Sequence, residues 1–225
     1  QAIKYNFILA YVNLGTLYND GYGIPKDYLK AKKYFEIAAK NNIPVALYEL
    51  GKLYYKGRGV EKNVNQAIKY FTESAQNNSE KAFCRLGVLY LIGKDVEKNI
   101  GKAKEYLISS ALKGNFKAIY HLGYLYFKIH DFLKARENFI ISSQKNDLEA
   151  TYYLGLLYEN GMGVEKNILK AIEYYKQFVT NKENRSFIKT NAIDEKTYVS
   201  KIFYNHYYYP SNNNLGLIFI TESDH

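Results

Sequence analysis

Apolar residues recur along this chain with the spacing of one face of an α-helix. The clearest examples are Ala46, Leu50, Leu53 and Tyr54 in one segment, and Ala82, Leu86, Leu89 and Tyr90 in the next. Residues at i, i+4, i+7 and i+8 share one side of a helix, so the pattern predicts a helix with one buried face. We call this element helix A.

A Leu-Gly pair marks the middle of each helix A and sets the period of the chain. The pairs are Leu14-Gly15, Leu50-Gly51, Leu86-Gly87, Leu122-Gly123 and Leu154-Gly155, and successive glycines lie 36, 36, 36 and 32 residues apart. A fixed period in this range is typical of solenoids, in which each unit packs only on its neighbours. Glycine inside a helix costs about 1 kcal/mol, so we expect a neighbouring helix to approach closely there.

A second segment of each unit begins at a residue suited to capping a helix, and we call it helix B. The caps are Asp27, Asn63, Asn99, Asp131 and Asn167. Their side chains accept hydrogen bonds from the free amides of a first helical turn. An alanine follows at positions 31, 67, 103, 135 and 171, and a large apolar or aromatic residue comes three or four residues later. The alanine is the expected seat for the facing helix.

Glycine-rich links join the two helices in most units. Examples are Asp20-Gly-Tyr-Gly23, Lys56-Gly-Arg-Gly59 and Asn160-Gly-Met-Gly163. Paired glycines predict the end of a helix followed by a turn with positive φ. A phosphate-binding loop is disfavoured because no strand precedes the glycines and no Lys-Ser/Thr follows them. In the third unit Asp95 replaces the second glycine, which we attribute to the relative ease with which Asp adopts left-handed conformations.

These motifs resemble the Sel1-like repeat family, a longer-looped relative of tetratricopeptide repeats. The shared pattern is Ala-x-x-x-Leu-Gly-x-Leu-Tyr, then Gly-x-Gly-Val-x-Lys-Asn, then x-x-Ala-x-x-Tyr, in five units over about residues 8–181. In spacing only the fourth unit departs, since its link, Lys128-Ile-His-Asp131, lacks the glycine loop and has the tetratricopeptide spacing. The resemblance implies an all-α fold, a right-handed α-solenoid of antiparallel helix pairs in a Sel1-like superhelix.

We expect residues 1–181 to form the repeat array and residues 182–225 an irregular C-terminal segment. Gln1–Tyr5 repeats the sequence of Gln66–Tyr70, so we interpret it as the stump of a preceding helix B and the chain as a piece of a longer array.

Two interpretations of residues 182–225 stay open. Thr197–Tyr209 and Leu215–Thr221 are rich in β-forming residues and are consistent with a β-hairpin. Alternatively, Leu215–Phe219 matches the core of helix A, which makes residues 182–210 an insertion before a sixth helix A. We favour the second interpretation.

Net charge of +9 permits binding to nucleic acid, to an anionic membrane surface or to an acidic protein. Lysines are spread through every unit with glutamates between them, which favours a solvated basic surface over a nucleic-acid footprint. Cys84 is the single cysteine, so an internal disulfide is excluded. No run of about 18 apolar residues occurs, so we expect no transmembrane segment in this chain. The sequence does not predict the cellular compartment.

No catalytic constellation is evident. The histidines are His121, His130, His206 and His225, and no pair has helical ligand spacing. There is no nucleophile elbow and no paired-acid motif, and Cys84 is expected to be a buried, inert thiol. The sequence therefore predicts a protein that is not an enzyme, with no catalytic residue, no metal site and no cofactor.

Solenoids of this kind bind partners on a concave surface, which helix A lines. By analogy with tetratricopeptide repeats, the positions three before and one, four and five after the Leu-Gly glycine face it. The predicted partner-binding residues are Tyr48, Lys52, Tyr55, Tyr120, Tyr124, Phe127 and Tyr152. Rings supply rigid contact area, and lysines at the margin favour an acidic or aromatic peptide segment. The alternative is that the superhelix or the C-terminal segment buries these rings.

The predicted function is a non-catalytic scaffold or adaptor that binds a protein partner, as a subunit of a larger complex. The family resemblance implies adaptor roles such as that of the lumenal adaptor of endoplasmic-reticulum ubiquitin ligases. A second hypothesis is nucleic-acid binding through the basic face, with tyrosines stacking on bases. Nucleic-acid affinity should collapse as salt rises, whereas peptide binding on aromatic anchors should fall modestly.

Overall fold

The computed structural model describes residues 2–180, with side chains described from residue 7 onward. Every regular element in that range is an α-helix. They are α1 (Ala2–Asp20), α2 (Tyr28–Ala39), α3 (Pro44–Lys56), α4 (Val64–Gln76), α5 (Glu80–Ile92), α6 (Ile100–Leu112), α7 (Phe116–Lys128), α8 (Phe132–Ser143), α9 (Leu148–Asn160) and α10 (Ile168–Thr180). The chain divides into two compact units, Gln1–Tyr175 and Lys176–His225, and the second is described only as far as residue 180.

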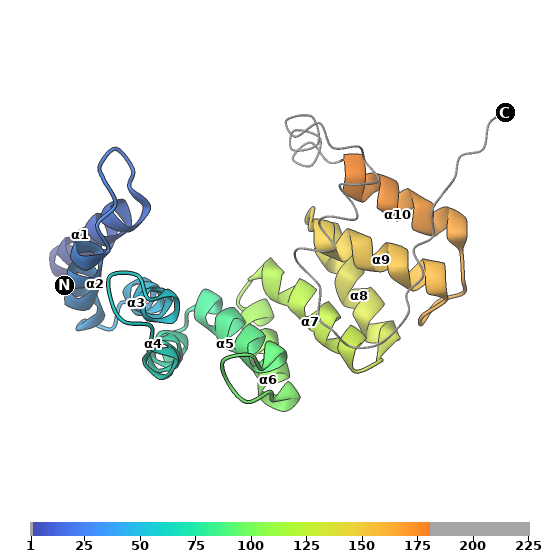
Figure 1. The fold of residues 1–225 in the computed structure, drawn as a ribbon, viewed down its shortest axis with the longest axis horizontal. Coiled ribbons are helices and arrows are strands. Elements are labelled where there is room, and N and C mark those ends of the chain that lie inside the picture. Colours follow the sequence, from blue (N-terminus) through green and yellow to red (C-terminus); the bar gives the residue numbers. More distant parts are fainter. Residues whose placement is uncertain (1, 181–225) are drawn as a thin grey trace. The chain divides into compact units, whose positions relative to one another are not determined.

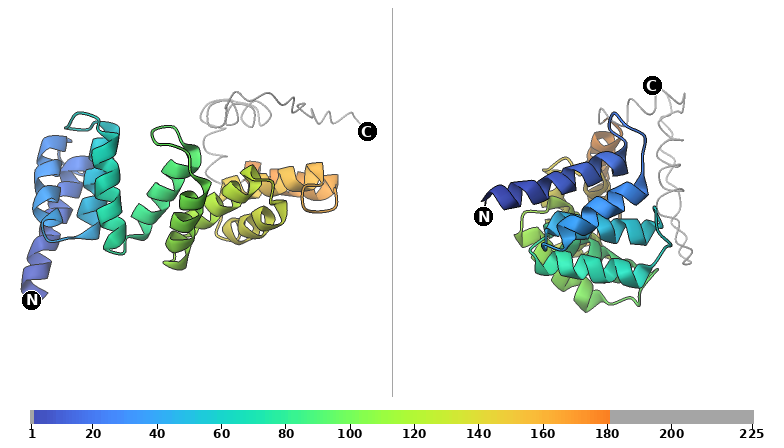
Figure 2. Two further views of the ribbon diagram at one scale, coloured as in Figure 1. Left: turned by 90° about the horizontal axis from the view of Figure 1, so that it is seen from below. Right: turned by 90° about the vertical axis from the view of Figure 1, so that its left-hand side faces the viewer.

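The helices alternate along the chain as the repeat pattern predicts (Figure 1). Odd-numbered helices carry the Leu-Gly pair and are helix A of each unit, and even-numbered helices are helix B. Each helix A from α1 to α7 packs on the helix B that follows it, and each helix B from α2 to α8 packs on the next helix A. Figure 2 shows the same succession from two further directions. The prediction of an all-α solenoid of helix pairs is therefore confirmed.

The predicted cap residues begin helix B in every unit. In α4 the Oδ1 atom of Asn63 accepts a hydrogen bond of 2.9 Å from the Gln66 amide, and the other four caps make equivalent bonds of 2.9–3.3 Å. The backbone amide of Asn63 donates to the carbonyl of Tyr54 at 2.9 Å, and every other cap bonds to the equivalent tyrosine of its own helix A. Each cap therefore sets both the start of helix B and its position against helix A.

The Leu-Gly glycines lie where a side chain of helix B touches the backbone of helix A. A Cβ atom on Gly51 would lie 2.5 Å from Cε1 of Phe71, which is closer than real Cβ contacts allow. The same contact recurs between Gly15 and Phe35, Gly87 and Leu107, Gly123 and Phe139, and Gly155 and Tyr175. The close approach predicted from the glycines is confirmed, and the helix B alanines are likewise fully or almost fully buried.

The hydrophobic core is shared between successive units. At one junction a single buried cluster contains Ala67, Phe71 and Ala75 of α4 together with Ala82, Leu86 and Leu89 of α5. Equivalent clusters join α2 to α3, α6 to α7 and α8 to α9. Because the apolar stripe of helix A packs on the preceding helix B, no unit buries its hydrophobic face alone.

The links between the helices follow the glycine prediction except at Asp95. Gly57 and Gly59 both have φ of 66°, as expected of paired turn glycines. In the third unit Gly93 is left-handed with φ of 69°, but Asp95 is not, so our explanation for its tolerance is wrong. Its carboxylate instead accepts a hydrogen bond of 2.6 Å from the hydroxyl of Tyr55, which holds the link by a side-chain contact.

Residues 2–5, interpreted from the sequence as the stump of a separate helix B, continue directly into α1. No glycine or proline lies between Tyr5 and Ala10 to end a helix, so one helix runs through this stretch. In the fourth unit α7 and α8 are joined by a short link in which His130 has φ of 62°. Both interpretations of residues 182–225 lie outside the described residues.

Candidate functional site

The candidate site is the helix-A surface, which we define as the side chains three before and one, four and five after the Leu-Gly glycine in α3, α5, α7 and α9. It includes all seven predicted partner-binding residues. Tyr120 is buried, with 9% of its surface exposed, and the other six are partly buried. Their surroundings differ along the array.

On α3, Tyr48 and Lys52 lie one helical turn apart and contact each other. The Lys52 Nζ atom lies 5.6 Å from the centroid of the Tyr48 ring and 2.7 Å from Oε2 of Glu49. The Tyr48 ring also lies against Phe71 of α4, with centroids 5.6 Å apart. Tyr48 is thus fixed against the core while part of its ring remains accessible.

Tyr55 connects α3 to the next unit. Its hydroxyl donates to Asp95, the guanidinium carbon of Arg85 lies 5.8 Å from its ring centroid, and Nζ of Lys62 lies 5.9 Å from it. Burial and the hydrogen bond to Asp95 raise the pKa of Tyr55, and the same hydrogen bond lowers the pKa of Asp95. The ring is therefore neutral, held in place, and flanked by two cations.

Three predicted residues of α7 gather around a tyrosine that the prediction left out. The ring of Tyr153 on α9 lies 6.3 Å from Tyr120, 5.7 Å from Tyr124 and 5.2 Å from Phe127, centroid to centroid. Tyr153 is itself stacked on the buried Phe139 of α8 at 5.0 Å. These rings therefore form part of the core between the fourth and fifth units as well as part of the surface.

Tyr152 is also packed against other rings. Its centroid lies 5.5 Å from that of Tyr175, whose hydroxyl donates a hydrogen bond of 2.6 Å to Oε2 of Glu159. Burial raises the pKa of Tyr152, so this phenol stays protonated. The helix-A surface is accordingly more open at Tyr48 and Tyr55 than at Tyr120 and Tyr153, which are both buried.

One repeat position belongs to this surface and was absent from the predicted set. It lies two residues before the Leu-Gly glycine and holds Glu49, Arg85, His121 and Tyr153 in α3, α5, α7 and α9. Three of these contact predicted residues, since Glu49 pairs with Lys52, Arg85 lies by Tyr55, and Tyr153 is the centre of the ring cluster. The sequence offered one signal for this position, namely that it holds a charged or aromatic residue in each of the four helices.

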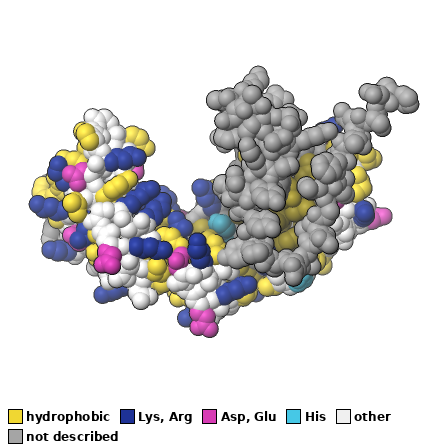
Figure 3. All heavy atoms as spheres, in the orientation of Figure 1, with side chains coloured by type: hydrophobic (Ala, Val, Ile, Leu, Met, Phe, Trp, Pro, Cys, Tyr) yellow, Lys and Arg dark blue, Asp and Glu magenta, His cyan; other side chains and the backbone are white. Residues whose placement is uncertain are grey.

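Cations accumulate where the surface is most open. Within residues 7–180, neither Lys56 nor Arg85 forms an ion pair, and the same holds for Lys117. Burial and the charges of Arg58, Lys52 and Arg85 together lower the pKa of Lys56, which shows that these cations lie close enough to repel one another. Figure 3 shows Lys and Arg side chains among hydrophobic ones over the helices from α1 to α6.

His121 and Cys84 are uncharged at neutral pH. Burial, with smaller contributions from Arg85 and Lys117, lowers the pKa of His121 to about 4. Burial raises the pKa of the Cys84 thiol to about 11, which disfavours the reactive thiolate, and the residue is partly exposed where the sequence predicts a buried one. Across the described part of the chain, no group of three or more His, Cys, Asp or Glu side chains could hold a metal ion.

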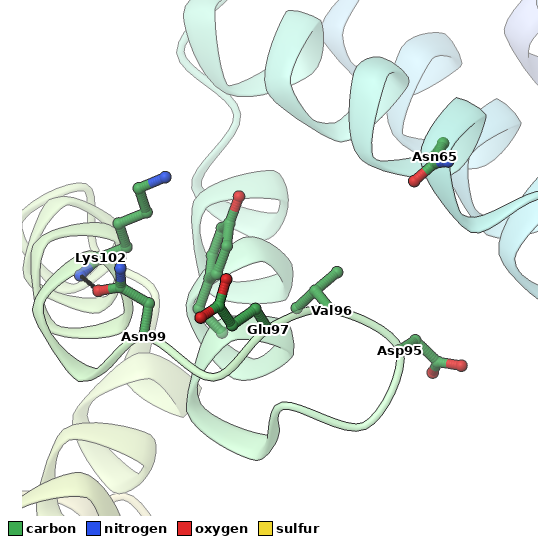
Figure 4. A pocket seen from close by; sticks show the side chains of 7 residues that line it. Asn65, Asp95, Val96, Glu97, Asn99 and Lys102 are labelled. Atoms are coloured by element: carbon green, nitrogen blue, oxygen red, sulfur yellow. Dashed lines mark hydrogen bonds between the residues drawn. The ribbon is translucent and has the colours of Figure 1, made fainter.

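A separate polar pocket of about 360 Å³ lies at the link of the third unit (Figure 4). It is lined by Asn65, Tyr90, Asp95, Val96, Glu97, Asn99 and Lys102. Two of its polar groups already have structural roles, because Asn99 caps α6 and Asp95 accepts from Tyr55. We therefore place the candidate site on the helix-A surface and not in this pocket.

The fold is that of a helical repeat protein, in which each unit packs on its neighbours along the chain. A family model of the Sel1 repeat matches residues 8–43, 44–79, 81–115, 116–128 and 148–179, which is more than half of the chain. The chain therefore belongs to the Sel1 repeat family. In the fourth unit the match covers only α7, consistent with the missing glycine loop that follows it.

Solved structures with the same fold include other Sel1 repeat proteins. A Sel1 repeat protein from Oxalobacter formigenes is 24% identical, with a TM-score of 0.73, and the match covers 86% of this chain and 84% of that one. A protective antigen of uropathogenic Escherichia coli is 22% identical, with a TM-score of 0.54, and covers 91% of this chain but 50% of that one. Immunity protein Pa5087 from Pseudomonas aeruginosa is 24% identical, with a TM-score of 0.53 and coverages of 80% and 67%.

At these identities the likeness concerns the fold alone. No curated protein matches the chain at a significant level. None of the helices between residues 2 and 180 combines the length and hydrophobicity needed to cross a lipid bilayer.

Proposed function

We propose that this Sel1 repeat protein is a non-catalytic scaffold that binds a segment of a partner protein on its helix-A surface, as a subunit of a larger complex. Sel1 repeat proteins generally act as protein-interaction scaffolds, which supports the proposal. The seven residues Tyr48, Lys52, Tyr55, Tyr120, Tyr124, Phe127 and Tyr152, with the added Arg85, form the proposed contact surface.

The observation that carries the proposal is the combination of accessible rings and unpaired cations near α3 and α5. Tyr48 and Tyr55 are partly exposed, yet each is held in place, by Phe71 and by Asp95 respectively. Rings that are already fixed lose little conformational entropy when a partner binds, so they make effective anchors. Arg85 lies beside the Tyr55 ring and forms no ion pair within the described residues.

These residues favour a partner segment that carries both acidic and apolar side chains. A carboxylate beside Arg85 can accept two parallel hydrogen bonds from the guanidinium group, which adds direction to the charge attraction. It would also offset the nearby cations, which add to the effect of burial in lowering the pKa of Lys56. An apolar or aromatic side chain of the same segment would pack on Tyr48.

The test compares two matched double variants in affinity pull-downs from nuclease-treated native extract. Tyr48→Ala with Arg85→Gln alters the proposed surface. Lys33→Gln with Lys69→Gln removes two exposed charges from helix B of the first two units and serves as the control. Helicity by circular dichroism should match wild type for both.

We expect wild type and control to retain the same protein, and the surface variant to lose it. Anisotropy with a synthetic segment of that protein should then show at least about tenfold weaker binding by the surface variant. Equal binding by all three proteins would show that the helix-A surface is not the contact site. Binding that disappears on nuclease treatment and falls steeply with salt would instead indicate nucleic acid.

A further inference from the structure

Three cationic side chains gather where the end of α3 meets α5. Lys56 is the last residue of α3, Arg58 follows in the link, and Arg85 belongs to α5. Burial has the largest effect in lowering the pKa of Lys56, and the charges of Arg58, Lys52 and Arg85 add to it in that order. Because both arginines act on Lys56, we treat Lys56, Arg58 and Arg85 as one group and call it the cation cluster.

The acidic side chains near the cation cluster are already paired with other groups. Oε2 of Glu49 lies 2.7 Å from Nζ of Lys52. Asp95 accepts a hydrogen bond of 2.6 Å from the Tyr55 hydroxyl, and its Oδ1 atom lies 3.4 Å from Nζ of Lys62. Within the described residues, no member of the cation cluster forms an ion pair. The cluster therefore keeps three positive charges that no side chain neutralises.

Both arginines of the cluster rest beside tyrosine rings. The guanidinium carbon of Arg58 lies 5.5 Å from the ring centroid of Tyr28, and that of Arg85 lies 5.8 Å from the ring centroid of Tyr55. A ring steadies a guanidinium group but does not use up its N–H donors, which stay available for an anion. Lys56 and Arg58 are exposed and Arg85 is partly exposed, so a ligand can reach all three.

The number of charges favours a phosphoryl group over a carboxylate. A carboxylate carries one negative charge, whereas a phosphorylated Ser, Thr or Tyr carries about −1.5 to −2 at pH 7 and offers three strong acceptor oxygens. Guanidinium groups bind phosphate through two parallel hydrogen bonds, and a lysine adds a point charge. A phosphodiester of a nucleic acid carries only one charge per group, so it matches three close cations less well.

We propose that the cation cluster binds a phosphoryl monoester on the partner segment, so that the partner is recognised in its phosphorylated state. This inference rests on the proposed function, which supplies the protein segment, and it adds Lys56 and Arg58 to the contact residues. The rings of Tyr48 and Tyr55 would receive apolar side chains next to the phosphorylated residue. Phosphorylation of the partner would then switch binding on.

The first test uses methyl phosphate as the probe and NMR spectra of the isotopically labelled whole chain. At about pH 7.5 a phosphate monoester carries nearly two charges. At constant ionic strength, the side-chain Nε–Hε signals of Arg58 and Arg85 should shift to saturation, with at least about tenfold tighter binding of methyl phosphate than of acetate. The Arg136 signal serves as an internal reference, because Arg136 belongs to α8 and lies outside the cluster.

A double variant tests the assignment of the site. Lys56→Gln with Arg58→Gln should weaken methyl phosphate binding at Arg85 at least about tenfold, because two of the three charges are lost. Both residues are exposed, so the variant should fold normally. Lys33→Gln with Lys69→Gln removes two exposed charges elsewhere and should leave binding unchanged. Shifts that do not saturate, that are equal for acetate, or that affect Arg136 equally would show only charge screening and would overturn the proposal.

The second test applies phosphatase to the extract used for the pull-down. The retained partner should be lost after phosphatase treatment, and untreated partner should be lost by Lys56→Gln with Arg58→Gln. A partner that is retained equally after phosphatase treatment would overturn this inference while leaving the proposed function intact. The proposed function fails in a different way, when Tyr48→Ala with Arg85→Gln retains the untreated partner, and the methyl phosphate titration needs no partner at all.

Discussion

Each repeat is held by a contact at the residue scale, in which a ring or a leucine of helix B rests on a glycine of helix A. Gly51 shows the geometry, since a Cβ atom at this position would lie 2.5 Å from the Phe71 ring, and Phe71 is fully buried. A close-packed interior has little room to move such a ring aside. The glycine is therefore required for packing and not for its backbone freedom.

We predict that Gly51→Ala lowers the free energy of unfolding by about 1–3 kcal/mol, the usual cost of overpacking a core. Gly101→Ala is the matched control, because Gly101 also lies in a helix but its added Cβ meets only Oδ1 of Asn99, at 3.4 Å. It should leave stability unchanged or raise it by less than about 1 kcal/mol. Urea unfolding followed by circular dichroism measures both, and an equal effect of the two substitutions would contradict the packing explanation.

His121 gives the protein a specific sensitivity to acid. Its folded-state pKa of about 4 lies below the ordinary value of 6.5, so the unfolded chain binds more protons between these two pH values. The stability that neutral His121 contributes is fully present above pH 6.5 and is lost as pH falls toward 4. We predict that His121→Gln flattens the fall in melting temperature over this window. A variant with the same pH profile as wild type would show that the pKa of His121 is not lowered in the folded protein.

At the element scale, hydrogen bonds to residues of helix A hold the links in position. The cap of each helix B bonds to a tyrosine carbonyl of its own helix A, as Asn63 does to Tyr54. The third link has a further connection, because Asp95 accepts from Tyr55 of the preceding unit at 2.6 Å. This side-chain contact lies where the first, second and fifth links have their second turn glycine.

We predict that Tyr55→Phe increases amide hydrogen exchange in the link Gly93–Asn99 with little effect on the helices. The substitution keeps the ring between Arg85 and Lys62 but removes the hydroxyl that bonds to Asp95. Tyr48→Phe is the control on the same helix, since no hydrogen bond of the Tyr48 hydroxyl is observed within the described residues. Exchange rates in the link that do not change in Tyr55→Phe would mean that Gly93 alone determines its conformation.

At the scale of the whole repeat array, stability is the sum of contacts between neighbouring helices. The main packing pairs run in chain order, from α1 with α2 to α8 with α9. A protein built this way resembles a one-dimensional series, in which a local defect spreads to adjacent units and fades with distance.

We predict that Gly15→Ala reduces hydrogen-exchange protection in α1 and α2 while leaving α7 to α9 unchanged. The added Cβ would lie 2.5 Å from the Phe35 ring, which joins these two helices. Gly123→Ala should have the opposite distribution, with loss in α7 and α8, because the conflict there is with Phe139. A uniform loss of protection in either variant would indicate a single cooperative domain.

The architecture was predictable because its signals are local and repeated. Asn63 caps a helix through an amide three residues away, and Gly51 and Ala67 mark contacts inside one unit. Asp95 was misjudged because its partner, Tyr55, lies 40 residues away in the chain. Residues 2–5, interpreted as the stump of a preceding helix B, belong to α1, because sequence similarity to another helix says nothing about where a continuous helix begins or ends.

The sequence by itself determined the class of fold, the period of the units and the helix that lines the candidate surface, because these depend on spacing within one unit. Only the tertiary structure decided which rings on that surface remain accessible. Tyr48 and Tyr55 stay partly open beside cations, whereas Tyr120 is buried against Tyr153 of the next unit. The accessibility of a ring depends on how the side chains of successive units pack against one another. The period of the sequence does not specify the distances between those side chains.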